Sequence, residues 1–143
     1  MGVRRLGPGD EASAGEACRL FGLSGELDPG AFLARPETTL LVAEEAGALV
    51  GWVYGHELAH PDGERTMLLY ALDVAEAFRG RGHATALVST FVALARVRGC
   101  TEVWVLTDDG NPGGLATYHA AGGTRDSVDQ VMFHWRLAEG RHS

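Results

Sequence analysis

The sequence has few cysteines, and no motif pairs them. Cys18 and Cys100 stand far apart, so neither a disulfide framework nor a cysteine-based zinc site is indicated. The first residues lack the apolar core of a signal peptide, and no run of about 18 apolar residues follows. We therefore expect a cytoplasmic protein with no metal centre and no membrane span.

Positive charge is also scarce. The chain has 12 Lys and Arg against 19 Asp and Glu, which gives a formal net charge of −7. Duplex nucleic acid requires a basic face, so we do not expect it as a partner. The acidic field favours a cationic small molecule as substrate. The other interpretation is that the charge only keeps a small protein soluble.

Linkers and internal repeats are absent as well. With 143 residues, 45% hydrophobic and 22% charged, the chain has the size and composition of one globular domain spanning residues 1–143.

Hydrophobic periodicity predicts alternating strands and helices. Period-two segments and short apolar runs indicate strands, and helical spacing after a polar or proline start indicates helices. The expected elements are strands at 3–6, 39–44, 49–57, 67–74, 102–107 and 131–137, and helices at 10–21, from Asp28, from Ala84 to Gly99, and at 115–121. Trp52, Trp104 and Trp135 fall in these strands and are expected in the core. The fold class is α/β, with a mixed, mostly antiparallel central sheet and flanking helices.

The stretch DVAEAFRGRGHATAL, residues 73–87, places glycines and arginines between a strand and a helix. The first N–H groups of a helix lack internal partners, and the helix dipole adds partial positive charge, so such a start binds phosphate. Gly80 and Gly82 permit close backbone approach, and Arg79 and Arg81 add charge. A P-loop lysine is missing, and the dinucleotide fingerprint lacks its third glycine.

Residues Arg79 to Ala84 read R-x-x-G-x-A, and Asn111, Tyr118 and Gly122 form the pattern N-x6-Y-x3-G after the fifth strand. These two spaced motifs resemble those of the GCN5-related N-acetyltransferases, which hold acetyl-coenzyme A. The first is like that family's pyrophosphate-binding motif. The runs RRLGPGDEASAGEACRLFG, LLVAEEAGALVGWVYG and DDGNPGGLATYHAAGGTRDSV extend the resemblance, over nearly the whole chain, to aminoglycoside 3-N-acetyltransferases of this type.

The resemblance implies an acyltransferase that uses acetyl-coenzyme A as co-substrate and acetylates an aminoglycoside amine, which confers antibiotic resistance. It also implies a homodimer, since dimers are frequent in the family. The expected coenzyme contacts lie on the fourth strand, the glycine loop and the later asparagine: Leu72, Val74, Arg79, Gly80, Arg81, Gly82, His83, Ala84, Thr85 and Asn111. The side chain of His83 is expected to be incidental.

Asp73 and Tyr118 are the expected catalytic residues. By resemblance, the Tyr118 phenol lies near the coenzyme sulfur and protonates the leaving thiolate; alternatively it is a core aromatic. Asp73 stands in an apolar strand, where a carboxylate is costly unless it is paired or solvated. It accepts the amine proton, binds a substrate ammonium, or only bonds local backbone. The relatives' carboxylate aligns with Ala71, and strand alternation keeps both positions on one face.

Four further polar residues are candidates for binding the acceptor. Asp108 and Asp109 follow the fifth strand, where by resemblance they lie beside the acceptor pocket; otherwise they are solvated or cap the next helix. His56 and Glu57 end the third strand and line the same pocket, or form an exposed strand end. Two other functions stay open: acetylation of another small amine or a protein N-terminus, and a non-catalytic coenzyme A-binding module.

Overall fold

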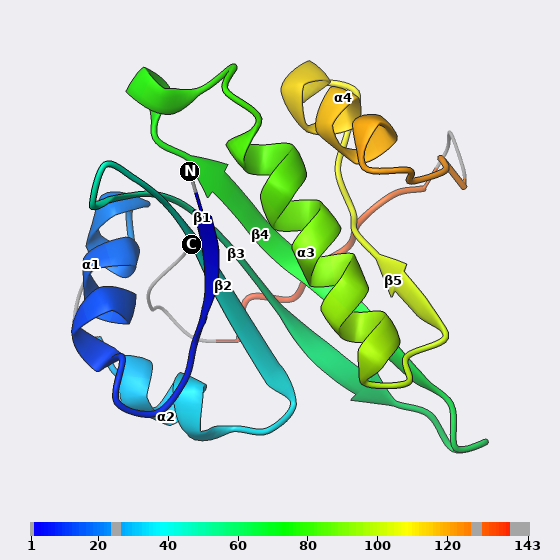
Figure 1. Cartoon of the computed structure of the whole chain (residues 1–143). Coiled ribbons are helices and arrows are strands. Elements are labelled where there is room, and N and C mark those ends of the chain that lie inside the picture. The colour runs from blue at the N-terminus through cyan, green and yellow to red at the C-terminus, as the bar shows by residue number, and fades with distance from the viewer. Residues whose placement is uncertain (1, 24–26, 127–129, 138–143) are drawn as a thin grey trace.

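The structure is a computed structural model that describes residues 2–23, 27–126 and 130–137 (Figure 1). Five strands form one sheet in the order β1-β2-β3-β4-β5, so strands that follow one another in the chain are also neighbours in the sheet. The pairs among β1 to β4 are antiparallel, and β5 joins β4 in parallel. The expected α/β fold with a mixed, mostly antiparallel sheet is confirmed.

The elements follow the predicted order. Their bounds are β1 (Gly2–Leu6), α1 (Glu11–Leu20), α2 (Pro29–Ala34), β2 (Thr38–Glu45), β3 (Ala48–Ala59), β4 (Arg65–Val74), a 3-10 turn (Glu76–Phe78), α3 (His83–Val97), β5 (Glu102–Trp104) and α4 (Pro112–Ala120). The β2–β3 turn is Ala46-Gly47, with φ of 52° and 80°, as a tight hairpin requires. Asp28 caps α2 through its carboxylate, which accepts a hydrogen bond from the Ala31 N–H at 3.2 Å.

Helix α3 covers one face of the sheet, as Figure 1 shows. Its fully buried Leu87 and Phe91 pack against Val53 and Leu69 in the larger core cluster. At Gly55 a Cβ would collide with the Leu68 carbonyl and with the Phe91 ring, so glycine is required for this close helix–sheet contact. The helix therefore has a fixed position on the sheet, and its N-terminus lies near the end of β4.

Helices α1 and α2 cover part of the other face. Ala14 and Ala17 of α1 and Leu33 of α2 pack on Val42 and Trp52 in a second cluster. This cover ends before β4, where the side chains of Tyr70 and Asp73 are exposed. The sheet thus has one face on which α3 packs and one that is open over the end of β4.

The predicted strand at 131–137 is wrong. These residues are described but lie outside any strand, and their apolar side chains are 75–92% exposed: Val131, Met132, Phe133, Trp135 and Leu137. Alternating apolar residues indicate a strand only where a neighbouring strand supplies hydrogen bonds, and none of the described strands pairs with this segment. The expected burial of Trp135 fails for the same reason, whereas Trp52 is buried as expected. Strand β5 is also shorter than predicted.

No helix within the described residues is long and apolar enough to cross a membrane.

Candidate active site

Strands β4 and β5 separate where the site begins. Their pairing ends at Leu68 and Trp104, while β4 continues to Val74. Beyond that point β4 is paired on the β3 side, with Val53 opposite Leu72. The expected coenzyme residues Leu72 and Val74 therefore have one backbone edge that β5 does not pair. An amide-bearing ligand arm can bond to such an edge in the way an added strand does.

A bulge in β4 rotates its last residues. Tyr54 pairs with Ala71 but Gly55 pairs with Leu69, so Tyr70 is an extra residue between them. Asp73, opposite Trp52, shares a sheet face with Ala71, as strand alternation predicts, and the bulge puts both residues on the same face as Tyr70. This is the face that the helices leave open.

The Asp73 carboxylate is held by an indole. Its Oδ2 accepts a hydrogen bond from Nε1 of Trp52 at 2.9 Å. Trp52 is 3% exposed and stacks on Phe21 with ring centroids 5.3 Å apart, so the donor has a fixed position. Asp73 itself is exposed, and within the described chain Trp52 is its hydrogen-bond partner. The other carboxylate oxygen, Oδ1, is thus available to a ligand.

Tyr118 lies on α4, which packs beside α3 (Figure 1). Burial, and then the negative charge of Asp73, raise the pKa of its phenol. The phenol therefore stays protonated at neutral pH. The two expected catalytic side chains lie within electrostatic reach of each other.

The N-x6-Y-x3-G motif sets the two ends of α4. The Asn111 side chain caps the helix, accepting a hydrogen bond from the Gly114 N–H at 3.1 Å and donating one to Thr107 at 3.2 Å. Gly122, with a φ of 91°, ends the helix beyond Ala120. Asn111 thus has a structural role that positions Tyr118, and its contact with coenzyme remains a prediction.

The loop before α3 is open for a phosphate group. Gly80 and Gly82 have φ of 76° and 88°, and a Cβ at either position would meet no atom within 4 Å. The first intrahelical hydrogen bond runs from Ala86 N–H to Gly82 C=O at 3.0 Å, and no side chain caps this helix start. The preceding N–H groups, which include those of Ala84 and Thr85, are therefore available to pyrophosphate. The loop fits the coenzyme that the sequence predicts.

Charged side chains fix this loop to the protein. Arg79 donates from Nε to the Val74 carbonyl at 3.0 Å. Arg81 forms an ion pair with Glu45 and lies 5.2 Å from the Phe78 ring centroid. Both guanidinium groups thus make protein contacts in this structure, and their expected contact with phosphate remains a prediction.

His83, like Arg81, joins this loop to Glu45, so the expectation that its side chain is incidental is wrong. It is 1% exposed, and its Nε2 lies 2.9 Å from Glu45 Oε1, while Nδ1 has no partner among the described residues. The hydrogen bond from His83, and then the charge of Arg81, lower the pKa of Glu45. Glu45, at the end of β2, was missed by the sequence interpretation because nothing in the motif points to a residue 38 positions earlier.

The expected acceptor carboxylates have internal partners. Glu57 pairs with Arg98 at 3.1 Å and with Arg65 at 3.5 Å, and its side chain is mostly buried. Asp109 pairs with Arg125 at 2.8 Å, which lowers the pKa of Asp109. Asp108 accepts a hydrogen bond from the Gly110 N–H at 2.7 Å. Their role in acceptor binding stays a prediction, whereas these structural roles are observed.

A group of rings on the open sheet face was also missed. We call it the aromatic face; it consists of Phe21, Phe32, Trp52, Tyr54, His56 and Tyr70. Tyr54 is its centre, and its centroid lies 5.0 Å from that of Trp52 and 5.6 Å from that of Tyr70. The alternating pattern W-x-Y-x-H in β3 was the available signal. The predicted His56 is a member, so this residue adjoins the site.

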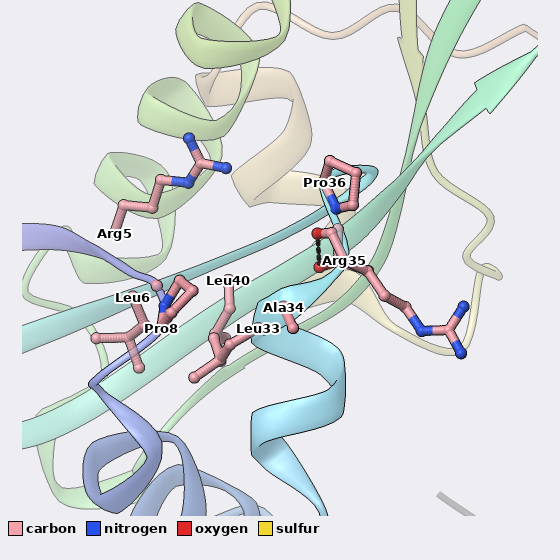
Figure 2. Close-up of a pocket in the computed structure, with 10 residues that line it drawn as sticks. Arg5, Leu6, Pro8, Leu33, Ala34, Arg35, Pro36 and Leu40 are labelled. Atoms are coloured by element: carbon pink, nitrogen blue, oxygen red, sulfur yellow. Dashed lines mark hydrogen bonds between the residues drawn. The ribbon is translucent and has the colours of Figure 1, made fainter.

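A cavity of about 460 Å³ lies elsewhere, between the end of β1, α2 and β2 (Figure 2). In Figure 2 the side chains of Arg5 and Arg35 point away from each other. The lining contains none of the expected site residues: Arg5, Leu6, Gly7, Pro8, Leu33, Ala34, Arg35, Pro36, Thr38 and Leu40. We therefore assign it no part in the site. Among the described residues, no group of three or more His, Cys, Asp or Glu is placed to hold a metal ion.

Comparison with known proteins identifies the family. The Acetyltransferase (GNAT) family matches residues 15–122. Acetyltransferase YE1169 of Yersinia enterocolitica is 36% identical over 112 residues, 78% of this chain and 74% of the relative. Because the family match runs from within α1 through α4, the chain belongs to the acetyltransferase (GNAT) family. The chain spans less than half the length of two rat N-acetyltransferases that it also matches, 44% and 37%.

Solved structures share the fold. The aminoglycoside acetyltransferase meta-AAC0020 from an uncultured soil metagenomic sample, in complex with sisomicin, superposes with a TM-score of 0.87 at 19% identity over 96% of both chains. Aminoglycoside N-acetyltransferase AAC(6')-Iy in complex with CoA superposes with a TM-score of 0.76 at 17% identity over 96% of this chain and 100% of that chain. At these identities the likeness establishes the fold.

Proposed function

We propose that this acetyltransferase moves the acetyl group of acetyl-coenzyme A directly to an amine of an aminoglycoside, at the 3-N position that the sequence resemblance implies. The observation that carries the proposal is the Trp52-anchored carboxylate of Asp73. It stands on the open face at the end of β4, within electrostatic reach of the protonated phenol of Tyr118.

Each group has a step in the reaction. N–H groups at the start of α3 hold the pyrophosphate, and the edge of β4 that β5 does not pair, at Leu72 and at the Val74 N–H, holds the pantetheine amides. Asp73 accepts the proton of the attacking amine, directly or through water, as the C–N bond forms. Tyr118 donates its proton to sulfur as the C–S bond breaks. Because its pKa is raised, the phenol is a weaker acid than a thiol, so it releases this proton only late in bond cleavage.

Two observations support a cationic acceptor. The net charge of −7 attracts cations, and a structural neighbour is an aminoglycoside acetyltransferase in complex with sisomicin. A second candidate is a smaller amine with fewer charges. The smaller amine is favoured because Glu57 and Asp109, two of the carboxylates expected to bind a polycation, already form ion pairs with arginines of the protein.

The test is coenzyme A release from acetyl-coenzyme A in the presence of gentamicin-type and apramycin-type aminoglycosides, alongside simple amines. Asp73→Asn should abolish most of the turnover. The control Asp62→Asn changes an exposed carboxylate in the β3–β4 loop and should leave turnover unchanged. If coenzyme A is released with simple amines but not with aminoglycosides, the proposed aminoglycoside acceptor is wrong and the acetyltransferase reaction stands.

We propose in addition that the protein works in the cytoplasm and that it is a homodimer. The exposed apolar side chains of residues 131–137 support the dimer.

A further inference from the structure

The side chain of Tyr70, at the edge of the aromatic face, is not part of the core. Tyr70 is 56% exposed, although one side of its ring stacks on Tyr54 at 5.6 Å and 28°. A stacked ring with this exposure has its second side open to solvent. His56 meets the edge of the same pair, with centroids 6.1 Å from Tyr70 and 6.2 Å from Tyr54.

The β4 bulge is the reason that Tyr70 and Asp73 share a face. Tyr70 stands two residues after Leu68, which is opposite His56, so ordinary alternation puts its ring on the open face, and the bulge brings Asp73, three residues further on, to that same face. An exposed tyrosine at this position adds little to the core. Its position is therefore better explained by a ligand than by folding.

The carboxylate of Asp73 lies on the same strand as Tyr70 and on the same face as these rings. Asp73 follows Tyr70 by three residues, and Trp52, which holds the carboxylate, packs edge-on against Tyr54 at 5.0 Å. The phenol rings of Tyr54 and Tyr70 thus lie on the same sheet face as the carboxylate of Asp73, which Trp52 holds in place. The flat side of an aromatic ring attracts cations and the C–H groups of an apolar ring, and a carboxylate binds an ammonium group.

We propose that the open side of Tyr70 is a platform on which a ring of the acceptor stacks while its primary ammonium group binds Oδ1 of Asp73. The ligand class is a primary amine attached to a ring with an apolar face, either an amino sugar or an aryl-alkylamine. This inference rests on the proposed function, because it places the reacting amine at the proposed base.

The experiment compares three amines of equal charge: glucosamine, phenethylamine and n-hexylamine. Equilibrium binding by calorimetry and turnover with acetyl-coenzyme A are measured for wild type, Tyr70→Ala and Tyr70→Phe. Val97→Ala is the control, since it shortens an exposed apolar side chain at the far end of α3. Tyr70→Ala should raise KM and Kd about three- to tenfold for at least one ring amine, with kcat little changed. Tyr70→Phe and Val97→Ala should behave like wild type, and hexylamine should not respond to Tyr70→Ala.

The outcomes separate the two proposals. A loss confined to the sugar or to the aryl amine supports the platform and identifies the kind of ring. Equal losses for hexylamine and the ring amines, or no loss for any amine, overturn the platform. Thiol release that does not depend on Tyr70 leaves the acetyltransferase function standing without the platform. Binding that depends on Tyr70 but gives no thiol release with any amine leaves the platform standing and contradicts the proposed function.

Discussion

At the scale of single residues, the proposed catalysis depends on how Trp52 holds Asp73. A carboxylate on an exposed strand end has many rotamers, and one hydrogen bond from a buried indole selects among them. Hydrogen bonds to charged groups contribute about 1.5–3 kcal/mol. The Trp52 donor therefore decides where the proposed base points.

Trp52→Phe tests this role because it keeps an aromatic ring and removes the donor, together with part of the buried indole. We expect kcat/KM for the amine to fall about tenfold or more, on the scale of one charged hydrogen bond. In a double-mutant cycle the effect should disappear in the Asp73→Asn background. Additive effects of the two substitutions would show that Trp52 acts on folding alone.

Tyr118→Phe tests the proposed acid. We expect kcat to fall roughly 10²-fold with little change in the KM for acetyl-coenzyme A. The protonated phenol is the form that the proposed mechanism uses, and its pKa is raised by burial and by Asp73. Loss of activity through phenolate formation should therefore begin only above the usual tyrosine pKa of about 10, and this alkaline limb should be absent in the variant. Unchanged turnover in Tyr118→Phe would remove the phenol from the mechanism.

The sequence indicated some of these residues and not others. Gly82 and Tyr118 belong to motifs that each lie within a short stretch of the chain. Asp73 is conspicuous as a carboxylate in an apolar strand. The roles of Trp52 and Tyr70 depend on strand register and on a bulge, which a local pattern does not encode. These two residues were therefore assigned only from the structure.

At the scale of elements, the loop before α3 is joined to the β2–β3 hairpin through Glu45. The folded-state pKa of Glu45 is lowered, first by the hydrogen bond from His83 and then by the charge of Arg81. A lowered carboxylate pKa stabilises the fold above the unfolded value of about 4.3, and this contribution is lost as the pH falls through the folded value.

Glu45→Gln should therefore lower the Tm at neutral pH and raise the KM for acetyl-coenzyme A. The difference in Tm between wild type and variant should shrink below about pH 4, where the wild-type carboxylate also loses its charge. Thermal unfolding across this range is the measurement. A difference that is constant at every pH would show that the charge of Glu45 is irrelevant.

Gly82→Ala tests the loop backbone, with Gly63→Ala as its matched control. Both glycines have left-handed φ, 88° and 90°, and open space where a Cβ would lie. Each substitution should cost about 1 kcal/mol of stability. Only Gly82→Ala should raise the KM for acetyl-coenzyme A, by about tenfold, because Gly63 lies in the β3–β4 loop. Equal effects on KM would mean that the glycine loop does not hold the coenzyme.

The elements themselves were mostly predictable. The hairpin, the caps of α2 and the helix α3 are specified by local residues such as Asp28 and Gly47. The segment at 131–137 was not, because a strand depends on a partner that the sequence pattern does not name.

At the scale of the whole molecule, that segment points to association. Exposed apolar patches on a protein surface mark interaction sites, and five large apolar side chains here are 75–92% exposed. A second copy of the chain would bury them. In sedimentation experiments wild type should be a dimer, and the double variant Phe133→Ser with Trp135→Ser should be a monomer. A monomeric wild type at micromolar concentration would contradict the proposed dimer.

The most direct test of acetyl transfer at Asp73 is the mass of the acceptor together with the amount of thiol released. With wild type we predict that each coenzyme A released is matched by one acceptor molecule heavier by one acetyl group, and that Asp73→Asn loses both signals together. Thiol release without an acetylated acceptor, or equal acetylation by Asp73→Asn, would contradict the account.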